Sequence, residues 1–82
     1  MRTIRFAWSP MLVEIRRETC PRARWLKAQR AWVMSADDAQ AFLTESHRRL
    51  EFARCYGAID VDGERWIVGF ARGAPYREAA RP

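Results

Sequence analysis

The chain contains 82 residues, of which 49% are hydrophobic and four are tryptophans. A chain of this length forms one domain, and its hydrophobic and aromatic content excludes a disordered polypeptide. The formal net charge of +5 points to an acidic partner, which is either a nucleic-acid backbone or an acidic protein surface.

Two features bear on the location of the protein. Residues 1–15 contain charges and a proline where a signal peptide needs an unbroken apolar run. The apolar runs elsewhere extend over only a few residues, which excludes a transmembrane helix. We therefore expect a cytoplasmic protein that makes no membrane contact and keeps Cys20 and Cys55 reduced.

The first predicted element is a β-hairpin over residues 3–16. Apolar residues alternate with other residues in two runs on either side of Ser9-Pro10: Ile4, Phe6, Trp8, Met11, Val13 and Ile15. Two period-2 runs around a Ser-Pro turn are typical of a hairpin, so these six side chains should share a buried face. The pattern allows two registers that differ by two residues.

The second predicted element is a long third strand over residues 23–34. Leu26 and Trp32 alternate with Trp25 and Val33, so that either side of the strand qualifies as the core side. A strand that is apolar on both sides is central to a sheet, bulged, or covered by a partner.

The third predicted element is an amphipathic helix that begins after Ser35. Ser35 is a favourable N-cap with Asp38 three residues later, and Gly57 supplies a stop signal. Apolar and small residues recur at spacings of three and four and form one buried stripe: Ala39, Phe42, Leu43, Ser46, Leu50 and Ala53. Phe52 points away from this stripe, which indicates either a partner or dimer contact, or packing by the chain around Tyr76.

The last predicted element is a hairpin over residues 56–70 with Asp62-Gly63 at its turn. The turn places Val61 opposite Glu64, Asp60 opposite Arg65 and Ile59 opposite Trp66. The buried face then carries Ile59, Val61, Trp66, Val68 and Phe70.

The element order β-β-β-α-β-β predicts a small two-layer α+β domain, in which one helix covers one face of an antiparallel-rich sheet. Residues 1–71 form this domain, and residues 72–82 are expected to be a mobile tail. The other face of the sheet is open to solvent or to a partner. On it we expect one parity of residues 23–33 together with Arg5, Glu14, Arg16, Asp60 and Arg65.

No group of residues predicts catalysis, a metal site or a cofactor. The single histidine, His47, is expected on the helix surface within reach of Glu51. Cys20, His47 and Cys55 are scattered along the chain and number one fewer than the four ligands of a structural zinc site. We therefore expect a protein that is not an enzyme.

The basic residues concentrate in the N-terminal part, because residues 1–34 carry eight basic and two acidic side chains. Fourteen of the fifteen basic residues are arginines, which suits phosphate and carboxylate binding, although a GC-rich genome explains the same excess. The residues predicted to bind a nucleic acid or another partner are Arg5, Arg16, Arg22, Arg24, Trp25, Lys27, Arg30 and Trp32.

The strand parity of residues 23–34 leaves two arrangements open. If Trp25 is buried, an exposed strip forms that would bind nucleic acid, and it consists of Arg22, Arg24, Arg30 and Trp32. If Trp32 is buried, the arginines on its side lie at the rim of the sheet.

The predicted function is a non-enzymatic, arginine-rich module that binds DNA, RNA or a nucleoprotein assembly. The alternative is a small inhibitor or adaptor of mobile-element or phage type that binds an acidic protein surface. It would use the same arginines, with Phe52 and a tryptophan as anchors, and could act as a homodimer. A homo-oligomeric structural subunit is a third reading.

Overall fold

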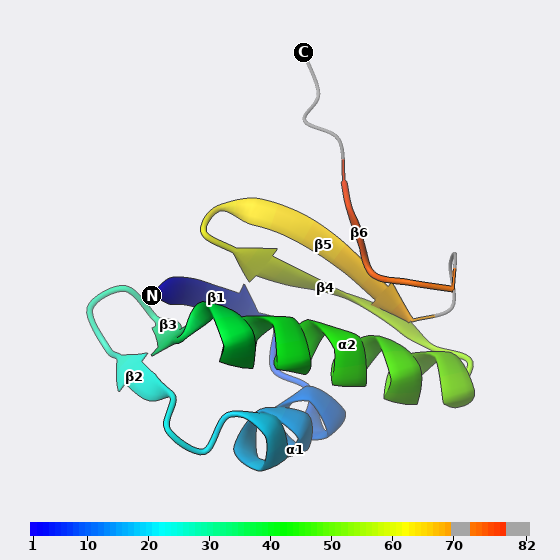
Figure 1. Ribbon diagram of the computed structural model, residues 1–82, viewed down its shortest axis with the longest axis horizontal. Coiled ribbons are helices and arrows are strands. Elements are labelled where there is room, and N and C mark those ends of the chain that lie inside the picture. The colour runs from blue at the N-terminus through cyan, green and yellow to red at the C-terminus, as the bar shows by residue number, and fades with distance from the viewer. Residues whose placement is uncertain (70–72, 79–82) are drawn as a thin grey trace.

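A six-stranded antiparallel sheet runs through the structure, a computed structural model that describes residues 1–69 and 73–78 (Figure 1). The strands lie in the order β2-β3-β1-β4-β5-β6. Their bounds are β1 (Arg2–Phe6), β2 (Arg24–Leu26), β3 (Ala31–Met34), β4 (Tyr56–Val61), β5 (Glu64–Gly69) and β6 (Tyr76–Arg77), and the helices are α1 (Pro10–Thr19) and α2 (Ala36–Phe52). None of these helices is long and apolar enough to span a membrane.

Both helices lie on one side of the sheet. Helix α2 contacts β4, β5 and β1, and α1 packs against α2. The predicted α+β class, with a helix across one face of an antiparallel sheet, is confirmed. The order of elements is β-α-β-β-α-β-β-β and therefore differs from the predicted β-β-β-α-β-β.

The predicted first hairpin is wrong, because its second strand is helix α1. Ser9 caps this helix: its Oγ accepts a hydrogen bond from the Leu12 amide at 3.3 Å, and Pro10 occupies the first turn. Proline is favoured there because its fixed φ suits a helix and its missing N–H would be unpaired anyway. Leu12 and Ile15 then reach the core three residues apart, so the period-2 pattern of the sequence was coincidental.

The predicted long strand over residues 23–34 is also wrong, because it is two antiparallel strands. A turn at residues 27–30 separates β2 from β3, and Arg30 adopts the left-handed region with φ 49°. The turn places Trp25 directly opposite Trp32. Both tryptophans therefore project from the same face, and neither of the two predicted arrangements is correct.

Helix α2 confirms the predicted N-terminus, where Ser35 Oγ accepts a hydrogen bond from the Asp38 amide at 3.1 Å. Its end differs from the prediction, since Arg54 terminates the helix in the left-handed region with φ 58°. The Cys55 amide donates to the Leu50 carbonyl at 2.8 Å, which completes a Schellman motif before Gly57. Ala53, predicted in the buried stripe, is exposed.

The β4–β5 hairpin confirms the predicted register, with Asp60 opposite Arg65 and Ile59 opposite Trp66. Ile59 and Val68 are fully buried, and Phe70 lies outside the described residues. Beyond this hairpin, Tyr76 and Arg77 form a short sixth strand along β5, which the sequence pattern did not predict. The rest of the predicted tail, residue 72 and residues 79–82, also lies outside the described residues.

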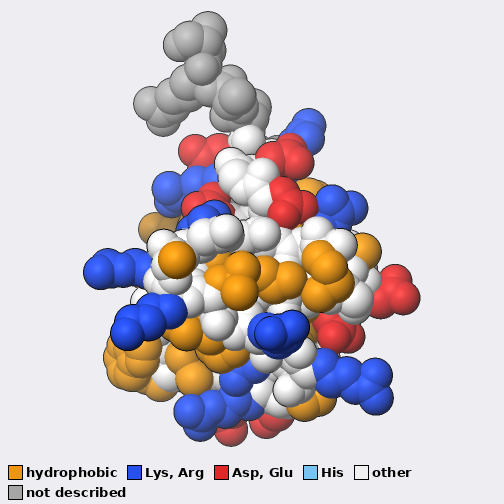
Figure 2. Space-filling model, turned by 90° about the vertical axis from the view of Figure 1, so that its left-hand side faces the viewer, with side chains coloured by type: hydrophobic (Ala, Val, Ile, Leu, Met, Phe, Trp, Pro, Cys, Tyr) orange, Lys and Arg blue, Asp and Glu red, His pale blue; other side chains and the backbone are white. Residues whose placement is uncertain are grey.

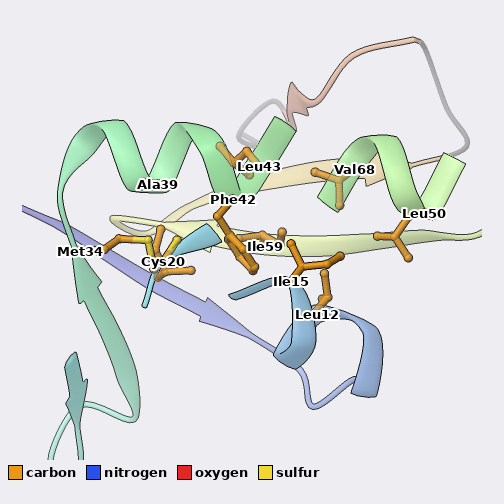
Figure 3. Packing of buried hydrophobic residues seen from close by; sticks show 11 residues of the cluster. Leu12, Ile15, Cys20, Met34, Ala39, Phe42, Leu43, Leu50, Ile59 and Val68 are labelled. Atoms are coloured by element: carbon orange, nitrogen blue, oxygen red, sulfur yellow. The ribbon is translucent and has the colours of Figure 1, made fainter. Parts of the chain in front are cut away.

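The core fills the space between the sheet and the two helices (Figure 3). Phe42 of α2 is fully buried and contacts Phe6 of β1, with ring centroids 5.4 Å apart. The buried cluster contains Ile4, Leu12, Ile15, Cys20, Met34, Ala39, Phe42, Leu43, Leu50, Ile59 and Val68. Burial raises the pKa of the Cys20 thiol, which therefore stays neutral and acts as a small apolar side chain.

His47 is buried, contrary to its predicted place on the helix surface. Its Nδ1 accepts a hydrogen bond from the Gly69 amide at 2.8 Å, and its Nε2 lies 3.3 Å from Glu51 Oε2. Gly69 has φ 102°, and a Cβ at this position would lie 2.3 Å from the Cys55 carbonyl oxygen. Glycine is therefore required where β5 passes the end of α2.

Candidate binding surface

Five arginines are neutralised by carboxylates of the same chain. Arg48 and Arg49 share Glu45, and Arg49 also contacts Glu18. The other ion pairs are Arg2–Asp62, Arg65–Glu78 and Arg77–Glu64. These arginines have acidic partners within the fold and offer less of their charge to a ligand.

The basic side chains around β2 are different. Arg22, Arg24, Lys27 and Arg30 are all exposed, and none makes an ion pair with a residue that the structure describes. They come from β2 itself, from the residues before it and from the turn after it. We call these four residues the β2 basic cluster. The cluster lies on and beside an edge strand, which has a neighbouring strand on one side only.

Arg5 and Arg16, also predicted to bind, lie next to this cluster in different ways. The Arg5 Nε donates to the Gln29 carbonyl oxygen in the β2–β3 turn at 3.2 Å. Arg16 does not lie on the sheet, since it belongs to α1, where it donates to the Cys20 carbonyl oxygen at 3.3 Å. Glu14, expected on the open sheet face as well, is likewise on α1.

The open face of the sheet is not a continuous cationic surface. Arg5, Asp60 and Arg65 lie side by side on β1, β4 and β5, so a carboxylate separates the two arginines. The predicted strip is therefore displaced toward the β2 end of the molecule. Figure 2 views that end and shows basic side chains projecting outward, with hydrophobic side chains between them.

A groove of about 510 Å³ opens at this end, between α1 and strands β1, β3 and β2. Its lining contains three tryptophans, three arginines, three further apolar residues and no carboxylate: Ile4, Arg5, Phe6, Trp8, Val13, Arg16, Trp25, Arg30 and Trp32. The volume falls within the range of about 300–1,000 Å³ that is typical of ligand sites.

The tryptophans of this groove differ in exposure. Trp32 is half-buried, Trp25 is 50% exposed and Trp8 is 79% exposed. The rings of Trp25 and Trp32 contact each other, with centroids 5.2 Å apart and planes tilted by 58°. The guanidinium of Arg16 lies 3.8 Å from the Trp32 ring centroid, a cation–π contact. Trp32 is therefore the floor of the groove.

Arg16 keeps its charge in this position. Partial burial, together with the neighbouring charge of Arg17, lowers the pKa of the Arg16 guanidinium below its usual value. An arginine nevertheless stays protonated in proteins at neutral pH. The groove therefore presents a fixed positive charge beside an aromatic floor.

Sequence reasoning missed Trp8 as a site residue. The predicted hairpin placed Trp8 on the buried face, whereas β1 ends at Phe6 and Trp8 lies in the exposed loop before α1. The signal that could have found it is the pair Ser9 and Pro10, which is typical of a helix start and places Trp8 in the loop before the helix.

Phe52 lies on an exposed surface, as its position on the helical wheel predicted. It is 91% exposed at the end of α2, and Tyr56, at the start of β4, is 75% exposed. Each of these two aromatic side chains is a candidate contact outside the lining of the groove.

The residues that could ligate a metal are not brought together. Cys20 is buried in the core, and Cys55 is exposed beyond the end of α2. Among residues 1–69 and 73–78, no group of three or more histidine, cysteine or acidic side chains is arranged to hold a metal ion.

Comparison of the chain with protein-family models, with curated proteins and with solved structures finds no match.

Proposed function

We propose that this chain is a non-enzymatic module that binds nucleic acid, alone or within a nucleoprotein assembly, through the β2 end of its sheet. The observation that carries the proposal is the contrast between paired and unpaired cations. Five arginines elsewhere have carboxylate partners, whereas the four basic side chains of the β2 basic cluster have none among the described residues. Arg17 and Arg54 also lack an ion pair there, so the distinguishing feature is that four unpaired cations fall within residues 22–30.

The cluster supports phosphate binding by its composition and its position. Its four exposed cations fall within one short segment, with Arg24 on β2 and the other three in the turns on either side of it. Arginine binds phosphate in a bidentate manner. Arg5 and Arg16 extend the positive charge from the cluster into the groove.

A salt titration tests the proposal. About four phosphate contacts release counterions, so the logarithm of the affinity should fall with the logarithm of salt concentration with a slope of about −3. We expect labelled oligonucleotides to bind with dissociation constants near the micromolar range at about 50 mM salt. Fluorescence polarisation measures both quantities, and affinity that is absent at low salt or indifferent to salt would refute the proposal.

The exposed Phe52 and Tyr56 favour a second candidate function, an adaptor or inhibitor that binds an acidic protein surface. Exposed aromatic side chains are enriched among the anchors of protein interfaces. This function predicts a protein complex that survives nuclease treatment and weakens in Phe52→Ala. A homodimer through the same surface would appear as a doubled mass in light scattering.

A further inference from the structure

We infer that the groove lined by Trp8, Trp25 and Trp32 holds one unstacked base, so that the module selects single-stranded over double-stranded nucleic acid. The inference rests on the proposed function and assigns a substrate class to the same end of the molecule.

The lining of the groove fits a ligand that is both planar and anionic. Three tryptophans and three arginines line it, and no carboxylate does. A cationic ligand would meet the arginines without a compensating negative charge. A bare phosphate would leave the apolar lining unused. A nucleotide supplies a flat aromatic base for the tryptophans and a phosphate for the arginines.

The three tryptophans have different roles in this assignment. Trp32 already contacts the guanidinium of Arg16 and the ring of Trp25, so its surface is largely occupied. Trp25 and Trp8 retain exposed ring surface on which a base can stack. Trp8 lies in the loop before α1, and Trp25 lies on β2, so the two rings approach the groove from different segments.

Selection of single strands follows from how bases are presented. In a duplex, the faces of the bases are covered by stacking, and a base must be extruded before it can contact an aromatic ring. In a single strand, the faces are accessible at lower cost, and stacking on aromatic side chains tolerates any base. Arg30, the member of the β2 basic cluster that lines the groove, would contact the backbone beside the inserted base.

The test compares four proteins: the wild type, Trp8→Ala, Trp25→Ala and the control Phe52→Ala. Phe52 is an exposed aromatic residue outside the lining of the groove, so its removal matches the loss of an aromatic side chain. Each protein is titrated by fluorescence polarisation with a labelled 12-nucleotide DNA strand, its RNA equivalent and the DNA duplex. Circular dichroism and the midpoint of thermal unfolding report whether each variant is folded.

For the wild type, we expect binding to the single strands to be at least about tenfold tighter than binding to the duplex. This is the gain in affinity that one base stacked on an aromatic side chain contributes. Trp8→Ala and Trp25→Ala should each lose about tenfold in single-strand affinity and little in duplex affinity. Phe52→Ala should bind as the wild type does. Replacing one central nucleotide by an abasic site should leave the affinity of the wild type for the single strand unchanged, because a neighbouring base can enter the groove instead. A strand in which every base is missing should bind about tenfold more weakly than the normal strand.

Two results overturn the inference, and they differ in what they say about the proposed function. In the first, binding depends on salt, is equally tight for single strand and duplex, and does not change in Trp8→Ala and Trp25→Ala. This result rejects the groove as a base site but agrees with nucleic-acid binding. Failure of every oligonucleotide to bind at low salt rejects both. Because Trp8 is 79% exposed, its truncation should not unfold the protein, so the comparison remains decisive even where Trp25→Ala is destabilised.

Discussion

Trp25 and Trp32 face each other across the β2–β3 pair, with their ring centroids 5.2 Å apart. This contact joins the edge strand to the rest of the sheet, and Arg16 joins α1 to the same cluster through the ring of Trp32. Aromatic and cation–π contacts therefore add to the backbone pairing that holds β2, the strand between the turns of the β2 basic cluster, against β3.

Replacement of Trp32 by alanine should destabilise the domain, because it removes the contacts with both Trp25 and Arg16. We expect a loss of about 2 kcal/mol in the free energy of unfolding, less than for a fully buried tryptophan. Urea denaturation followed by circular dichroism measures this loss. Trp8→Ala is the control and should change stability by no more than about 0.5 kcal/mol. Equal losses in the two variants would mean that Trp32 does not anchor β2.

Ser9→Ala tests whether residues 10–19 form a helix. The Ser9 hydroxyl caps α1, and loss of an N-cap side chain costs about 1 kcal/mol. The same substitution at Ser35, the N-cap of α2, should have a similar effect and serves as the reference. Urea denaturation of both variants gives the comparison, and an unchanged stability for Ser9→Ala alone would argue for the turn that the sequence pattern predicts.

His47→Leu should destabilise the domain by about 1–3 kcal/mol, because it leaves the buried Gly69 amide without its acceptor. Glu51→Gln removes only the carboxylate charge near Nε2, on a side chain that is 47% exposed, and should have little effect. Chemical denaturation distinguishes the two variants. A small loss for His47→Leu would show that the hydrogen bond to Gly69 contributes little to stability.

Stability should fall in acid because of Glu45. Hydrogen bonds from Arg48 and Arg49 lower the pKa of Glu45 from 4.5 to about 2. Because the pKa in the folded state lies below the value in the unfolded state, this stabilisation is fully present above about pH 4.5 and is lost as the pH falls toward 2. Asp62, whose pKa is lowered by the Thr3 amide and by Arg2, acts in the same direction.

The midpoint of thermal unfolding, measured between pH 7 and pH 2.5, checks this expectation. Glu45→Gln should show a shallower decrease than the wild type, although Asp62 keeps part of the slope. Glu14→Gln is the matched control, since Glu14 is exposed on α1 and makes no ion pair with a described residue. An identical slope in wild type and Glu45→Gln would contradict the role of the Arg48–Glu45–Arg49 contacts.

The second half of the chain was predictable from its sequence, because local signals there agree with one another. The Asp62-Gly63 dipeptide specifies one turn, and the apolar residues on either side of it alternate in the register that the structure adopts. Ser35 and the spacing of three and four residues likewise indicate one helix. Burial of His47 was not predictable, since its partner Gly69 is 22 residues away.

The first half was not predictable in the same way, because its short segments fit more than one period. Residues 11–16 fit a strand by alternation, whereas Leu12 and Ile15 fit a helix, and only the Ser9-Pro10 pair distinguishes the two. In residues 27–30, no glycine or proline marks the turn, and Arg30 adopts positive φ without a signal in the sequence. The positions of Trp8, Trp25 and Arg16 around one groove depend on these two segments, so the candidate site could be predicted in composition but not in geometry.

The most direct test of the proposed function compares two variants of equal net charge. One is the triple variant Arg22→Gln, Arg24→Gln, Arg30→Gln in the β2 basic cluster, and the other is Arg48→Gln, Arg65→Gln, Arg77→Gln, whose arginines are ion-paired. Polarisation titrations of a labelled single-stranded oligonucleotide across salt concentrations measure the affinity and its salt slope. We predict that the cluster variant reduces the magnitude of the slope by about 2 to 3 and weakens binding at least about tenfold, while the paired variant stays close to wild type. Equal losses in both variants would show that binding follows net charge alone and would contradict a site at β2.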